Sequence, residues 1–185
     1  MPYCPAMSEN ETEPIQVFRH CPRCGAAPLT PHVTYGFACA GCGFLFFLNV
    51  ASAVAAIIRD DQDRVLLTRR AHEPERGKLD IPGGFVDWSE TAEQALAREI
   101  REELQLEIEA PTYFCSISNL YDFRGLRYRT LDLYFTCTVR DFAPLAPGDD
   151  IDGYEFVDLA RLDQVPIGFD SVRRALGRLT RVAKG

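Results

Sequence analysis

Three glutamates behind a Gly-Gly pair constrain this chain of 185 residues more than any other feature. Glu99, Glu102 and Glu103 lie in GGFVDWSETAEQALAREIREELQL, the stretch from Gly83 to Leu106. At about 100° per residue, Glu99 and Glu103 share the apolar face of a helix, and Glu102 neighbours Glu99 on its surface. Like charges at the edge of a core are costly unless a cation compensates them. A hard divalent cation such as Mg²⁺ or Mn²⁺ would do so; the alternative is a solvated, charge-rich helix face.

The residues around the glutamates resemble the Nudix box. The positions that match are Gly84, Glu90, Arg98, Glu99, Ile100, Glu102, Glu103 and Leu106, preceded by the lead-in Leu79-Asp80-Ile81-Pro82-Gly83. Gln105 is the one departure, because the family pattern has Gly there. That Gly would suit a left-handed residue closing the helix, and a non-Gly residue costs roughly 1 kcal/mol. The departure therefore weakens a helix cap and removes no catalytic group.

The resemblance implies a loop, a helix and a second loop that bind a divalent metal and position a water against a phosphorus atom. Mg²⁺ or Mn²⁺ would stabilise the charge that develops on phosphoryl oxygens and lower the pKa of the water. The general base is either Glu99 or an acid on a later loop, with Asp150 and Glu155 as candidates. The residues that match the metal-binding and catalytic positions are Glu99, Glu102, Glu103 and the Gly84 carbonyl, with Arg98 and Glu90 orienting the carboxylates.

Four cysteines form a second pattern, Cys21-x₂-Cys24 and Cys39-x₂-Cys42, with fourteen residues between the pairs. Each pair, followed directly by a glycine, predicts a tight knuckle, and two knuckles supply four thiolates for tetrahedral zinc. Disulfides are the alternative, but the N-terminus does not resemble a secretory signal, so we expect reduced thiols. A site closed by four thiolates has no open position for chemistry, so this zinc ribbon would be structural or a platform for a dimer or substrate. A DNA-binding ribbon would need more cations than residues 20–49 contain.

Composition agrees with one enzyme domain behind a small zinc-binding domain. A hydrophobic content of 46% can form a full core, and the net charge of −7 argues against a long polyanion such as nucleic acid as partner. The longest apolar run is shorter than the roughly 18–20 residues that span a bilayer. We expect a disordered tail at 1–19, a zinc ribbon at 20–49 and a Nudix hydrolase domain at 50–185, in a soluble, cytoplasmic protein.

Hydrophobic alternation predicts strands at 50–59, 64–70, 113–123, 127–139 and 154–158. Helices are expected at 87–105 and 170–181, with Asp87 or Ser89 capping the first of them. This order fits the α/β class, and within it the α/β/α sandwich of the Nudix fold, with the box helix packed on a mixed sheet.

A zinc ribbon ahead of a Nudix domain resembles the NADH pyrophosphatase architecture, including its cysteine spacing. Those enzymes carry a Ser-Gln-Pro-Trp-Pro-Phe-Pro segment after the box, and the region from Ser116 to Asp132 contains neither proline nor tryptophan. We therefore expect a dinucleotide or nucleotide sugar such as NADH, ADP-ribose or FAD as substrate, without that subfamily's preference. The resemblance also allows a homodimer.

Two alternative functions are a non-catalytic nucleotide-sensing regulator and an enzyme that removes caps from RNA. Side chains that could meet phosphates or a base are Arg69, Arg70, Tyr121, Arg124 and Arg127.

Overall fold

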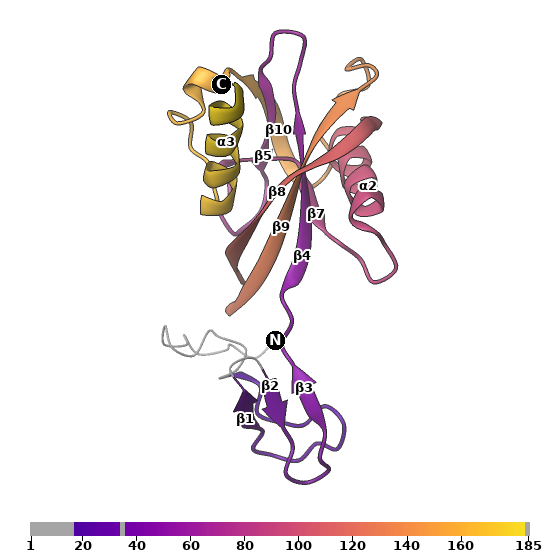
Figure 1. The fold of residues 1–185 in the computed structure, drawn as a ribbon, viewed down its shortest axis with the longest axis vertical. Coiled ribbons are helices and arrows are strands. Elements are labelled where there is room, and N and C mark those ends of the chain that lie inside the picture. The colour runs from indigo at the N-terminus through magenta and orange to yellow at the C-terminus, as the bar shows by residue number, and fades with distance from the viewer. Residues whose placement is uncertain (1–16, 34–35, 184–185) are drawn as a thin grey trace. The chain divides into compact units, whose positions relative to one another are not determined.

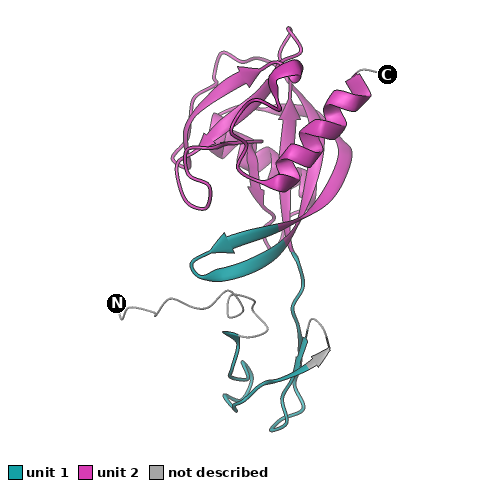
Figure 2. Ribbon diagram, turned by 90° about the vertical axis from the view of Figure 1, so that its left-hand side faces the viewer, with its two compact units in different colours: residues 1–50, 120–129 teal, residues 51–119, 130–185 magenta. Residues whose placement is uncertain are grey.

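The computed structural model describes residues 17–33 and 36–183, so the tail expected at 1–19 lies almost entirely outside the described residues. The chain divides into two compact units (Figure 2). One comprises residues 51–119 and 130–185 and carries the box; the other comprises residues up to 50 together with 120–129. The domain limits expected from the sequence stay a prediction, because this division places the tip of a hairpin, 120–129, with the smaller unit.

Two sheets carry the fold of the box-containing part. The first has the strand order β7 (Gly83–Phe85), β4 (Ala51–Ile58), β9 (Leu126–Val139) and β8 (Ile108–Phe123). Because β4 runs parallel to β9 and antiparallel to β7, this sheet is mixed, as expected. The second sheet is antiparallel, in the order β10 (Ile151–Val157), β5 (Val65–Arg70) and β6 (Leu79–Asp80). An isolated bridge from Arg59 to Val65 connects the two sheets.

Two helices, α2 (Ala92–Leu104) and α3 (Asp170–Ala183), pack on opposite sides of the sheets (Figure 1). Alternate side chains of β4 point to opposite faces, as strand geometry requires. Val54, Ala56 and Ile58 join the core beneath α2. Ala55 and Ile57 join the core beneath α3, which follows a short 3₁₀ helix at Leu159–Arg161. The α/β/α sandwich is therefore confirmed. Among residues 17–33 and 36–183, no helix is long and apolar enough to cross a membrane.

The box helix begins later than the sequence predicts. Neither Asp87 nor Ser89 caps it; Thr91 does, since its Oγ1 accepts from the backbone of Gln94 at 3.3 Å and its N–H donates to the Gln94 side chain at 2.8 Å. This reciprocal pair satisfies two backbone donors at once. Residues 87–90 instead form a turn closed by a hydrogen bond from the N–H of Glu90 to Asp87 O, 3.1 Å. The expected start at residue 87 was therefore wrong.

The short strands β6 and β7 escaped the hydrophobic pattern because they contain two and three residues. β7 depends on Gly83, which has φ 147° and packs against β4. A Cβ at this position would lie 2.1 Å from Val54 O, so only glycine permits the pairing. The pairing fixes Gly84, the next residue, opposite Val54. β8 also begins at Ile108, five residues before the expected start at 113.

The smaller unit contains a three-stranded antiparallel sheet of β1 (Thr30–Val33), β2 (Gly36–Ala38) and β3 (Leu45–Phe47). Its buried core includes Leu29 and Phe37, and two cysteines complete it. A core of this size stabilises a fold weakly without a metal or another cross-link.

Candidate active site and zinc site

Arg98 connects the box glutamates. Its Nε and Nη2 donate to the two carboxylate oxygens of Glu90 at 2.7 and 2.8 Å. Its Nη1 donates to Glu99 Oε1 at 2.7 Å and to Glu102 Oε2 at 3.2 Å, while Nη2 also reaches Phe85 O at 3.0 Å. The hydrogen bonds from Arg98 lower the pKa of Glu90 to about 2. Arg98 thus contacts Glu90, Glu99 and Glu102 together, and the orienting role that the resemblance implies for Arg98 and Glu90 stays a prediction.

Glu103 lies on the side of α2 that faces β7, where Gly83 N–H donates to Glu103 Oε2 at 3.0 Å. Burial raises the pKa of Glu103 to about 8; that hydrogen bond opposes the rise, and Glu99, Asp80 and Asp150 add to it. Burial also raises the pKa of Glu99, against the effect of the neighbouring guanidinium. The raised pKa favours the protonated form of Glu103 near neutral pH. Glu99 and Glu103 are partly buried, and carboxylate oxygens in this setting suit a hard divalent cation.

Gly84 leaves room for the Glu99 carboxylate. A Cβ on Gly84 would lie 2.5 Å from the Cδ and Oε1 atoms of Glu99. Any side chain at this position would displace the carboxylate from the backbone of β7. The close approach places Glu99 against the strand whose Gly84 carbonyl is the expected further metal ligand.

The three glutamates are not gathered as tightly as a bound ion would hold them. In the part of the chain that the structure describes, the four cysteines form the one group of three or more potential ligands with atoms all within 4.8 Å. Arg98 attracts Glu99 and the 62% exposed Glu102, whereas Glu103 turns towards Gly83. Metal binding by the glutamates therefore stays a prediction.

The loop after β9 packs against the end of α2 and brings one acid to the box. Gly148 N–H donates to Glu103 O at 2.7 Å, and the loop leads directly to Asp150. Asp150 contributes to the raised pKa of Glu103, so its carboxylate lies near the buried box acid. Glu155 is bound by Arg69 at 2.6 Å. Asp150 therefore acts electrostatically on the box, and the choice between Asp150 and Glu155 as a later-loop base stays a prediction.

Arg69 and Arg70 both make contacts within the box-containing unit. Besides Glu155, Arg69 donates to Gly77 O at 2.8 Å. The Arg70 guanidinium donates to Asp80 Oδ2 at 3.1 Å and lies 5.0 Å from the centre of the Phe169 ring. Arg70 is thus held by contacts with Asp80 and Phe169, and substrate contact by either arginine stays a prediction.

Tyr121, Arg124 and Arg127 belong to the smaller unit, at the tip of the β8–β9 hairpin. The Tyr121 and Phe123 rings are 6.1 Å apart, and Arg124 lies 5.1 Å from the Phe123 ring. Arg127 donates twice to Asp122, at 2.8 and 3.0 Å. Their assignment to substrate binding stays a prediction.

Asp80 is a further charged group that the sequence reading missed. Burial raises its pKa to about 6, although its side chain stays 15% exposed and both Arg70 and the Ile81 N–H stabilise its charge. Its charge also raises the pKa of Glu103. The sequence feature that could have identified Asp80 is its place between Leu79 and Ile81, two apolar residues that the fold buries.

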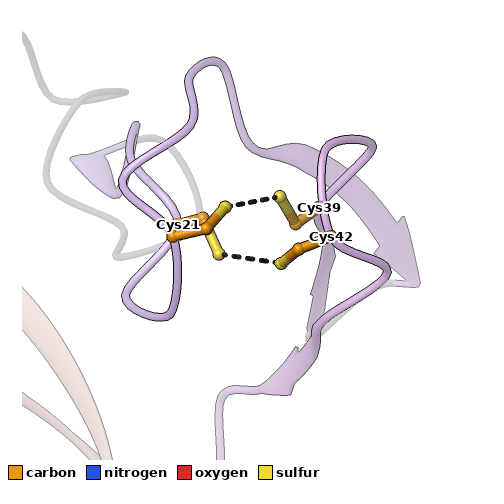
Figure 3. A group of neighbouring side chains, drawn as sticks. Cys21, Cys39 and Cys42 are labelled. Atoms are coloured by element: carbon orange, nitrogen blue, oxygen red, sulfur yellow. Dashed lines mark hydrogen bonds between the residues drawn. The ribbon is translucent and has the colours of Figure 1, made fainter.

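The thiols of the four cysteines converge on one point, and Figure 3 shows Cys21, Cys39 and Cys42 among them. All four thiols are free. The Sγ atoms of Cys21 and Cys42 are 3.8 Å apart, and those of Cys24 and Cys39 are 3.7 Å apart. With Zn–S bonds of about 2.3 Å, the edge of a sulfur tetrahedron is about 3.8 Å. The separations therefore fit zinc.

The two knuckles have the same backbone geometry. Gly25 has φ 73° and donates to Cys21 O at 2.9 Å; Gly43 has φ 69° and donates to Cys39 O at 2.9 Å. Both residues occupy the left-handed region, which confirms that glycine is needed where each knuckle bends. The repeated turn directs each pair of thiols to one side.

Residues 50–176 match the family model of the NUDIX domain. This match covers more than half of the chain and includes the Gly-Gly strand, the box helix and the loop that carries Asp150. The chain belongs to the Nudix family.

The similar proteins include an ADP-ribose pyrophosphatase, several NAD-capped RNA hydrolases and an 8-oxo-dGTP diphosphatase. The ADP-ribose pyrophosphatase of Methanocaldococcus jannaschii is 33% identical over 129 residues, which are 70% of this chain and 74% of that protein. The NAD-capped RNA hydrolase NudC of Vibrio vulnificus is 31% identical over 101 residues, 55% of this chain and 38% of that protein. The chain thus matches well under half of the NudC protein's length.

Solved structures share the fold. A NUDIX hydrolase from Nitrosomonas europaea has a TM-score of 0.69 at 24% identity, covering 88% of this chain and 90% of that one. The NUDIX domain of Shewanella oneidensis NrtR, solved with ADP ribose, has a TM-score of 0.61 at 22% identity. The match covers 74% of this chain and 90% of that one. At these identities the likeness establishes the fold alone.

Proposed function

We propose that this protein hydrolyses the phosphoanhydride bond of a dinucleotide or nucleotide sugar, with ADP-ribose as the first candidate. Its class, a Nudix pyrophosphohydrolase acting on a nucleotide derivative, follows from the family and the relatives. The observation that carries the proposal is the set of box carboxylates: Arg98 binds Glu99 and Glu102, and the partly buried Glu103 beside them has its pKa raised to about 8. ADP-ribose is placed first because the relative named for it aligns with the larger share of both chains.

The residues present suit a divalent cation, and Glu99, Glu102, Glu103 and the Gly84 carbonyl would hold it. When bound, Mg²⁺ or Mn²⁺ stabilises charge on phosphoryl oxygens and acidifies a coordinated water. Arg98 restrains the orientation of Glu99 and Glu102, and its paired contact with Glu90 keeps the guanidinium in place. The Gly83 N–H fixes one oxygen of Glu103.

Glu99 is our first candidate for the general base, with Asp150 as the alternative. Burial raises the pKa of Glu99, which increases its affinity for a proton. Asp150 lies on a loop anchored to the end of α2 and acts electrostatically on Glu103. A Glu99→Gln variant that loses turnover while Asp150→Asn keeps most of it supports Glu99; the reverse result assigns the base to Asp150.

Removal of a nucleotide cap from RNA is the second candidate function, and the similarity to NudC proteins favours it. Purified protein with equal concentrations of ADP-ribose, NADH, FAD and a short NAD-capped RNA would separate the two. Higher kcat/KM for the small compounds supports our proposal, and higher kcat/KM for the RNA replaces it with the second. A non-catalytic sensor predicts binding without turnover of any of them.

The same panel tests the box when Mg²⁺ or Mn²⁺ is supplied. We expect Glu102→Gln and Glu103→Gln to lose turnover. Glu107→Gln is the matched control, because Glu107 lies just beyond the box and pairs with Arg101 at 2.7 Å on the surface. Equal turnover by the box variants and the control would contradict the assignment of the box.

We also propose that Cys21, Cys24, Cys39 and Cys42 bind one structural zinc ion. The support is the tetrahedral spacing of the four sulfurs and the twin knuckles that present them. Elemental analysis of the purified chain should give one zinc per chain. Its absence after purification without chelator would contradict the proposal.

A further inference from the structure

Trp88 is the chain's single tryptophan, and its side chain is fully exposed, with a relative exposure of 108%. Tryptophan usually buries most of its large apolar surface. Because the Trp88 side chain is uncovered, it contributes little packing to the fold. It is therefore free to contact a ligand.

The turn that presents Trp88 is held at both ends. Glu90 N–H donates to Asp87 O at 3.1 Å, and Asp87 N–H donates to Glu90 Oε2, also at 3.1 Å. Trp88 and Ser89 are the two residues between them. One step before the turn, Val86 N–H donates to Ser52 O of β4 at 3.0 Å. The Trp88 backbone thus sits on a closed turn anchored to the sheet.

The same turn is tied to the carboxylate cluster. Arg98 binds both oxygens of Glu90 at the end of the turn and reaches Glu99 and Glu102 with Nη1. Trp88 also follows Gly84 by four residues, so their Cα atoms are at most about 14 Å apart. One guanidinium therefore couples the position of the tryptophan turn to that of the expected metal ligands.

We propose that Trp88 is a substrate-contacting residue whose indole stacks on a planar heterocycle joined to the diphosphate, whether adenine or the ring of the second moiety. The inference rests on the proposed function. An aromatic ring on an ordered turn loses little entropy on binding, and every base offers it a π-face. A protein partner fits less well, because one tryptophan offers at most about 250 Å² whereas a stable interface buries about 800 Å² on each side.

Substitution of Trp88 should act on substrate affinity and leave stability unchanged. Trp88→Ala should raise KM for ADP-ribose by about 5- to 150-fold, the usual range for loss of one stacked base, with a smaller effect on kcat. Trp88→Phe keeps a ring and should recover most of the affinity. Ser89→Ala, in the same turn, is the matched control and should behave as wild type. All three should unfold at the wild-type temperature, since the Trp88 side chain is fully exposed.

The single tryptophan also reports binding directly. We would titrate the full chain in Mg²⁺ with α,β-methylene-ADP and with methylenediphosphonate, which resist hydrolysis and differ only in the adenosine. We expect saturable quenching of Trp88 emission by the first compound and none by the second. Inhibition of turnover by α,β-methylene-ADP without a change in emission, or an unchanged inhibition constant in Trp88→Ala, would overturn the proposal. Failure of α,β-methylene-ADP to inhibit at all would also overturn it.

Two further outcomes keep the inference separate from the proposed function. Absence of turnover with every nucleoside diphosphate derivative defeats the proposed function, whether or not the emission is quenched. Emission that changes with protein concentration, without ligand, assigns Trp88 to a contact between two copies and overturns the substrate assignment.

Discussion

Protonation of Glu103 should make metal binding depend on pH. Its pKa is raised to about 8, chiefly by burial, and a divalent cation binds the carboxylate form. Glu103 is then about 3% ionised at pH 6.5 and half ionised at pH 8. The apparent affinity for Mg²⁺ should therefore rise about 16-fold between these values, and binding at pH 7 should release about 0.9 proton per ion. Calorimetry in buffers of different ionisation enthalpy measures both quantities.

The raised pKa of Glu103 also predicts how the stability of the metal-free protein changes with pH. A carboxyl whose folded pKa lies above its ordinary value binds more protons folded than unfolded, so its contribution to stability falls as pH rises from about 4.5 to about 8. In chelator, the wild type should lose stability over this interval relative to Glu103→Gln. Glu102→Gln should bind Mg²⁺ more weakly but keep the pH dependence, because Glu102 is exposed. An affinity that is flat from pH 6.5 to 8, or a slope that survives in Glu103→Gln, would refute the reasoning.

Three other predictions follow from the geometry. Gln105→Gly should raise the free energy of unfolding by about 1 kcal/mol in denaturant titrations, since φ at this position is 58°, whereas Glu93→Gly inside α2 should lower it by about as much. Gly84→Ala should lower kcat about 10- to 100-fold with an unchanged melting temperature, because its methyl group would stand 2.5 Å from the Glu99 carboxylate. Cys24→Ser should reduce zinc, measured by elemental analysis, from one per chain to a small fraction; retention of a full equivalent would argue against four-thiolate ligation.

Features fixed by short-range spacing could be predicted from the sequence. The helix period places Glu99 and Glu103 beside the apolar stripe, and both are indeed more enclosed than Glu102. The left-handed conformations of Gly25, Gly43 and Gln105 were likewise predictable, because each depends on the residues immediately around it. The start of the box helix was not, since two possible caps preceded Thr91 and only the hydrogen bonds distinguish them.

The electrostatics of the box were decided by the tertiary structure. Glu103 acquires its raised pKa from burial and from two acids distant in sequence, Asp80 on β6 and Asp150 on the loop that packs against the end of α2. Its hydrogen bond comes from the N–H of Gly83 on β7, a strand that lies too close to β4 for a Cβ at this residue. Sequence alone determined that these carboxylates share one helix, because helical spacing is local. Their desolvation depends on segments brought together only by folding, so the raised pKa of Glu103 could be recognised only in the folded structure.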